Sequence, residues 1–176
     1  MKETKEVGFG KNIREIIFGV EDGCIGNLGL VVGMAQAAAA NNLILLAGLA
    51  TMAAQAISMS AGNYLSLKSE QEYFSVRSKA RAYGKAYSKH KNPLYSSIVM
   101  GFSVMVGAAI PLSVFLFTES QSGIIPAIII TLIALFLLGT IKARYTLRPW
   151  LKSGVEVLII GFIAAAAGYL IGNLFS

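Results

Sequence analysis

The chain has 176 residues, of which 55% are hydrophobic and only 14% are charged, and its formal net charge is +6. A soluble domain carries about 25% charged residues, so this composition predicts a membrane protein. One cysteine, Cys24, and one histidine, His90, exclude an intrachain disulfide and a zinc site built from cysteine and histidine within one chain.

Five apolar segments are each close to the length of about 20 residues that a helix needs to cross a bilayer. They cover residues 16–40, 43–67, 95–117, 123–141 and 154–175. The first is too long for a signal peptide, contains acids and lacks a cleavage pattern. We therefore expect an all-α, multi-pass membrane protein with a single transmembrane domain over residues 1–176. Its membrane would be the plasma membrane in a prokaryote, and otherwise a vacuolar or other organellar membrane.

The basic residues are confined to three regions: before the first segment, between the second and third, and between the fourth and fifth. The other connections, residues 41–42 and 118–122, and the C-terminus carry none. By the positive-inside rule, the N-terminus is then cytoplasmic and the C-terminus lies on the opposite side. This alternation with membrane spans suits a cytoplasmic membrane face, so a nucleic-acid partner is not expected.

The basic connection 68–93 repeats Tyr73, Arg77 and Tyr87 at helical spacing. This spacing predicts a cytoplasmic helix that continues from the second segment, with one face able to rest on lipid headgroups. Two roles remain open. The connection is either an interfacial packing helix or a metal-entry site that uses Glu70, Glu72 and His90.

In the first segment, five glycines fall within an arc of about 120° on a helical wheel, and such a face permits close helix–helix packing. They are Gly19, Gly23, Gly26, Gly29 and Gly33. Asp22 falls inside this arc, whereas Glu21 lies near the opposite side. We expect Asp22 to point at a packed neighbour or a pore, and Glu21 to face another helix or the cytosolic headgroups.

The second segment carries a matching stripe of small and polar residues. The stripe comprises Gly48, Thr51, Gln55, Ser58, Met59, Gly62 and Ser66, with Met52 on its edge and Asn63 beside it. A lipid-facing stripe would instead be built from leucine, isoleucine and valine. The pattern therefore predicts a face turned toward the bundle interior or toward water.

Counting from the Asn41-Asn42 turn at 1.5 Å per residue, Asp22 and Met59 differ in depth by only about 3 Å. A carboxylate within the membrane costs about 2.5–3.5 kcal/mol or more, which makes Asp22 a functional-site hypothesis. A carboxylate beside a thioether suits a first-row divalent metal better than Mg²⁺ or Ca²⁺. The alternatives are that Met59 only packs and that Asp22 only hydrogen-bonds a neighbouring helix.

Four stretches resemble the vacuolar iron transporter family: REIIFGVEDGCIGNLGLVVG (14–33), GLATMAAQAISMSAGNYLSLKSEQ (48–71), NPLYSSIVMGFSVMVGAAIPL (92–112) and GVEVLIIGFIAAAAGYLIG (154–172). The resemblance implies five spans and a homodimer whose pore lies between subunits and is lined by the first helices. It also implies proton-coupled export of Fe²⁺, and often Mn²⁺, from the cytosol. The metal is then the transported ion rather than a resident cofactor. The family's pore aspartate maps onto Asp22 and its pore methionine onto Met59.

Two departures from the family pattern bear on mechanism. Asn63 stands where the family usually has glutamate in its G-E-Y-x-S run, which leaves proton coupling open. The glutamate-rich cytoplasmic domain of larger members is replaced by the short basic connection. We expect a metal transporter, with a non-transporting scaffold or metal sensor as the alternative. An enzyme is not expected because no nucleophile–base pair or metal triad is visible.

Overall fold

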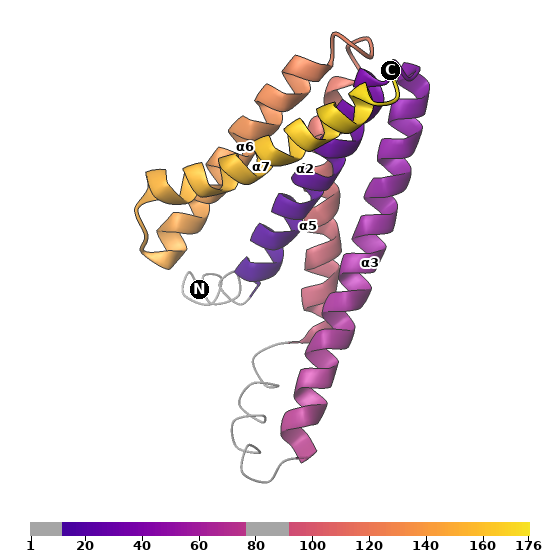
Figure 1. The fold of residues 1–176 in the computed structure, drawn as a ribbon. Coiled ribbons are helices and arrows are strands. Elements are labelled where there is room, and N and C mark those ends of the chain that lie inside the picture. The colour runs from indigo at the N-terminus through magenta and orange to yellow at the C-terminus, as the bar shows by residue number, and fades with distance from the viewer. Residues whose placement is uncertain (1–11, 77–91) are drawn as a thin grey trace.

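The computed structural model describes residues 12–76 and 92–176, and the regular structure of this part is helical. It contains α2 (Ile13–Gln36), α3 (Asn41–Val76), α5 (Pro93–Val114), α6 (Ile124–Thr146) and α7 (Trp150–Asn173). All five are long and apolar enough to cross a membrane. They run alternately between the two ends of one bundle (Figure 1). The predicted all-α, multi-pass membrane fold is therefore confirmed.

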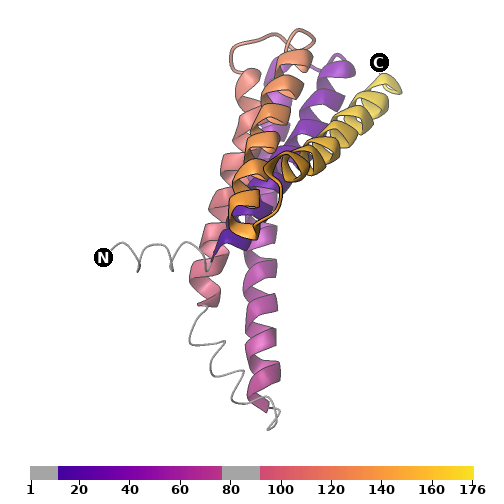
Figure 2. The ribbon, with the colours of Figure 1, turned by 90° about the vertical axis from the view of Figure 1, so that its left-hand side faces the viewer.

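Helix α2 is the centre of the bundle. It packs extensively against α5 and α7 and also touches α6 and α3 (Figures 1 and 2). Helix α3 packs mainly on α5 and is the least covered of the five helices. The bundle therefore surrounds most of α2 but leaves much of α3 on its outside.

Small residues set the distances between the helices. A Cβ atom at Gly107 of α5 would collide with the carbonyl oxygen of Val20 in α2. One at Gly168 of α7 would collide with the carbonyl oxygen of Gly29 in α2. Because lipid tails are as apolar as leucine, such close backbone packing is a main source of association between membrane helices.

Local sequence explains where the helices begin and end. Helix α5 begins with Pro93 at its first position, and the Asn92 side chain accepts the Leu94 N–H at 3.0 Å. Helix α6 ends at Thr146. The next residue, Leu147, adopts a left-handed backbone with φ 54°, and Pro149 follows shortly after. The chain then enters α7 directly, so α6 and α7 form a tight pair.

Several helix bounds differ from those of the predicted apolar segments. Helix α3 continues to Val76, α6 continues to Thr146, and α7 already begins at Trp150. Apolar patterning marks where the chain leaves lipid, whereas backbone hydrogen bonds continue the helix beyond that boundary. Of the predicted helical connection 68–93, residues 77–91, and with them Arg77, Tyr87 and His90, lie outside the described residues.

The basic side chains of the described part gather at one end of the bundle, here called the basic end. They belong to the start of α2, the C-terminal part of α3 and the α6–α7 turn. These segments lie toward the same end of the bundle (Figure 1). These residues are Arg14, Lys68, Lys142, Arg144, Arg148 and Lys152. The opposite end carries no lysine or arginine within residues 12–76 and 92–176.

Candidate functional site

The contact between Gln55 and Gly26 shows the register of α3 on α2. A Cβ atom at Gly26 would collide with the amide group of Gln55. The two helices run in opposite directions, so one turn toward the basic end leads to Asp22 on α2 and to Met59 on α3. Asp22 and Met59 therefore lie at the same level, and both side chains are half-buried.

Asp22 forms no hydrogen bond or ion pair with any residue that the structure describes. Such a carboxylate within a membrane span requires water, an ion or another chain nearby to offset its cost. It is the feature of α2 that most clearly points to a ligand.

Helix α3 presents two further polar groups along the same line as Met59. The Gln55 side-chain oxygen and the Asn63 side-chain nitrogen are enclosed by protein and have no hydrogen-bond partner. Gln55, Met59 and Asn63 are spaced by four residues and so lie along one face of the helix. Two unpaired amide groups thus flank the thioether at the level of Asp22.

The rest of the predicted α3 stripe is divided between the inside and the outside of the bundle. Gly48 is buried against Leu112 of α5, whereas a Cβ at Gly62 would have nothing within 4 Å. Thr51 and Met52 are half-buried, and Ser58 and Ser66 are exposed along with Gly62. The part of the stripe near Gly48 faces the interior of this single chain, whereas Ser58, Gly62 and Ser66, toward the basic end, are exposed.

The five glycines of α2 face three neighbours. Gly19 and Gly23 pack on α5, Gly26 packs on Gln55 of α3, and Gly29 and Gly33 pack on α7. An arc of about 120° is wide enough to meet several helices when its own helix is central to the bundle. The wheel gave the direction of each glycine but not the identity of the helix that it meets.

Glu21 is half-buried and interacts electrostatically with Lys142 of α6 and with the neighbouring Asp22. Glu21 therefore lies on the α6 side of α2, toward the basic end. Cys24 is fully buried, and its thiol donates to the Gly107 carbonyl oxygen at 3.3 Å. This contact gives the cysteine a packing role between α2 and α5.

Glu70 and Glu72 lie on the last turns of α3, near the basic end. Glu72 pairs with Lys68 at 4.0 Å, and both side chains are exposed, so this ion pair contributes little stability. Within the described ranges, no three side chains among histidine, cysteine, aspartate and glutamate are grouped to hold a metal ion. His90, the third residue of the predicted entry site, lies outside those ranges.

Sequence reasoning missed two buried polar residues of α2, Glu15 and Asn27. The Asn27 amide donates to the Ala108 carbonyl oxygen of α5 at 2.9 Å and to the Gly48 carbonyl oxygen of α3 at 3.4 Å. The sequence offered one signal for Asn27, because it is a polar residue in the middle of a membrane span and lies one turn after Gly23. Asn27 joins three helices just beyond the level of Asp22.

Comparison with known proteins adds an independent finding. A family model described as the VIT family matches residues 13–83 and 75–173. Vacuolar iron transporter 1 of Oryza sativa subsp. japonica is 30% identical over 91% of this chain and 84% of its own length. The Arabidopsis thaliana protein of the same name is 28% identical over 94% and 86%. Vacuolar iron transporter homolog 1 of Arabidopsis thaliana is 26% identical over 96% and 87%.

Proposed function

Because the chain belongs to the VIT family, we propose that it is a membrane transporter that exports a divalent transition metal, Fe²⁺ or Mn²⁺, from the cytosol. The observation that carries the proposal is the contact between Gln55 and Gly26, whose register places Asp22 and Met59 at a common level. The metal is cargo, so the protein acts as a transporter rather than as an enzyme.

The two side chains divide the recognition of the ion. The Asp22 carboxylate supplies a charged oxygen ligand, and the Met59 thioether supplies a softer ligand. Mg²⁺ and Ca²⁺ prefer oxygen ligands alone, so the thioether favours first-row transition metals. The ion would pass between α2 and α3, a path here called the α2–α3 metal route. Gln55 and Asn63 provide neutral polar groups along this route, with Met52 and Ser58 as accessory lining residues. Glu21 stands toward the basic end, where Glu70 and Glu72 would attract incoming ions.

A second copy of the chain completes the site in this proposal. One carboxylate and one thioether are too few ligands for a dehydrated ion, whereas a two-fold homodimer supplies two of each. Two observations support this arrangement. The exposed part of the α3 stripe would otherwise present Ser58, Gly62 and Ser66 to lipid. A groove of about 640 Å³ between α2 and α7 also offers a small-residue surface for a partner helix.

Protons exchange with the metal at Asp22. Two carboxylates that face each other across a symmetry axis resist ionising together, so one holds a proton when no metal is bound. Metal binding releases that proton, and protonation from the far side releases the metal. The membrane is the plasma membrane in a prokaryote, and otherwise a vacuolar or other organellar membrane.

The test is ion flux in proteoliposomes that contain the purified full-length chain. Fe²⁺ and Mn²⁺ are compared with Mg²⁺ and Ca²⁺, with and without a pH gradient. We expect transport of the first pair only, its loss in Asp22→Ala, and its retention in Glu156→Gln, which removes an exposed carboxylate on α7. Normal flux in Asp22→Ala would overturn the site. Metal binding without flux in the wild type would instead favour a sensor or scaffold.

A further inference from the structure

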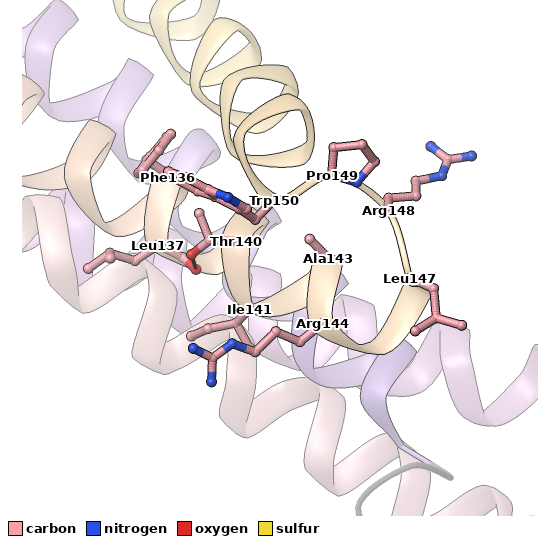
Figure 3. A pocket seen from close by; sticks show the side chains of 10 residues that line it. All are labelled: Phe136, Leu137, Thr140, Ile141, Ala143, Arg144, Leu147, Arg148, Pro149 and Trp150. Carbon is pink, nitrogen blue, oxygen red and sulfur yellow. Dashed lines mark hydrogen bonds between the residues drawn. The ribbon is translucent and has the colours of Figure 1, made fainter.

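A pocket separate from the proposed metal site lies at the basic end, between the end of α6 and the start of α7 (Figure 3). Its volume is about 920 Å³, and its lining is mostly apolar. Phe136 and Ile141 form part of the wall, and the Phe136 ring meets the Trp150 ring edge to face at 6.5 Å between centroids. The α2–α3 metal route shares no residue with this pocket.

Two arginines stand at opposite rims of the pocket. Arg144 extends back along α6 beside Ile141, whereas Arg148 extends outward from the α6–α7 turn (Figure 3). Neither guanidinium forms an ion pair with a residue in the described ranges. A smaller adjoining pocket of about 330 Å³ is lined by Arg148, Lys152 and one carboxylate, Glu156. The rim therefore has an excess of positive charge that the described part of the chain leaves available.

The exposed side chains of the α6–α7 turn indicate where the pocket lies in the bilayer. Leu147 is 94% exposed and Trp150 is 60% exposed. Leu147 also adopts a left-handed backbone, which is uncommon for a residue other than glycine. Exposed leucine and tryptophan beside arginine are typical of the boundary between lipid tails and headgroups. The pocket therefore opens at headgroup level, where an acyl chain can reach its apolar wall.

We propose that this pocket binds one anionic glycerophospholipid, with its acyl chain along the Phe136 and Ile141 wall and its phosphate at the Arg144 or Arg148 rim. Arginine binds phosphate oxygens through paired N–H donors, and basic pockets between membrane helices recognise anionic headgroups. A choline headgroup would place its own cation beside these guanidiniums. A free phosphate ion would leave the apolar wall uncovered, so the lipid is the ligand that matches both halves of the pocket.

The pocket contains its own probe, because Trp150 is the only tryptophan of the chain. The full-length protein is placed in phosphatidylcholine nanodiscs that contain a small fraction of lipid brominated on its acyl chains. That fraction is either phosphatidylglycerol or phosphatidylcholine, and bromine quenches Trp150 fluorescence on contact. We expect stronger quenching by phosphatidylglycerol, with a preference on the order of fivefold from the arginine that binds the headgroup.

The double variant Arg144→Gln/Arg148→Gln should equalise the quenching by the two lipids. Lys68→Gln is the matched control, since it removes a positive charge at the same end but outside the pocket, and it should keep the preference. Equal quenching by both lipids in the wild type overturns the proposal and needs no variant to fold. A preference that survives in the double variant also overturns it, because overall charge then explains the effect. Displacement of the brominated lipid by inorganic phosphate at constant ionic strength would show a free-anion site instead.

Discussion

The Gln55 side chain of α3 packs directly on Gly26 of α2, in a space that even one methyl group on α2 would fill. This contact brings Asp22 and Met59 to one level, because each lies one turn from it toward the basic end. The geometry of the proposed metal site therefore depends on the register of the two helices. A shift of α3 along α2 would move the thioether away from the carboxylate.

Close packing between α2 and α5 predicts an asymmetry between two glycines of the same helix. A Cβ atom at Gly23 would collide with the Val104 carbonyl oxygen, which belongs to the backbone and cannot swing aside. A Cβ at Gly29 would make an ordinary contact at 3.5 Å with the Ala164 carbonyl oxygen. Gly23→Ala should lower the free energy of unfolding in detergent by about 1–3 kcal/mol, the usual cost of overpacking. Gly29→Ala should leave it nearly unchanged, and equal effects of the two variants would contradict this packing.

Met59→Leu should change which metal is transported more than how much is transported. Leucine keeps the apolar volume but removes the sulfur, and a softer ligand favours Fe²⁺ over Mn²⁺. The ratio of Fe²⁺ to Mn²⁺ flux should fall. Met105→Leu on the exposed side of α5 is the matched control and should keep the ratio. An unchanged ratio in Met59→Leu would mean that Met59 only packs.

Asn63 provides a test of proton coupling. Its side-chain nitrogen is enclosed without a hydrogen-bond partner, and it stands one turn from Met59 on α3. Asn63→Glu introduces a titratable group on the route, so metal flux should depend more steeply on the pH gradient. Asn63→Gln preserves the amide and should behave like the wild type. If both variants show the same dependence on pH, position 63 has no part in coupling.

The proposed homodimer predicts a specific cross-link. Cys24 is fully buried, so the wild-type chain offers no accessible thiol. Ser58→Cys places a thiol on the exposed part of the α3 stripe and should form a disulfide-linked dimer under mild oxidation. Ile133→Cys on the exposed side of α6 is the control and should remain monomeric on a non-reducing gel. Equal cross-linking of the two variants would place the subunit interface elsewhere.

Much of the fold could be predicted because the bilayer imposes a simple constraint. A run of about 20 apolar residues crosses it as a helix, and all five helices were predicted in the correct order on this basis. The continuation of the second helix into the basic connection was predicted from the helical spacing, and α3 does continue to Val76. The start of α7 at Trp150 was not predicted, because helices extend into water where hydropathy gives no signal. The α6–α7 pocket was missed for the same reason, since its rim lies at the boundary of the lipid.

The proposed site was only partly accessible from the sequence. The helical wheel placed Asp22 on the glycine arc, and the residue count gave its depth relative to Met59. A helical wheel contains no information on the position of α2 in the bundle. The assignment of its glycines to three different neighbouring helices therefore required the structure. Asn27 could be noticed as a polar residue in mid-span, but its role could not be predicted, because it depends on carbonyl oxygens in α5 and α3.

The most direct test of the metal site is a double-mutant cycle on Asp22 and Met59. Equilibrium binding of Fe²⁺ is measured anaerobically for the wild type, Asp22→Asn, Met59→Leu and the double variant in nanodiscs. If both side chains hold one ion, the two substitutions should couple by about 0.5–3 kcal/mol, with the second costing little after the first. Free-energy losses that add to within about 0.5 kcal/mol would show independent residues and would contradict a shared site.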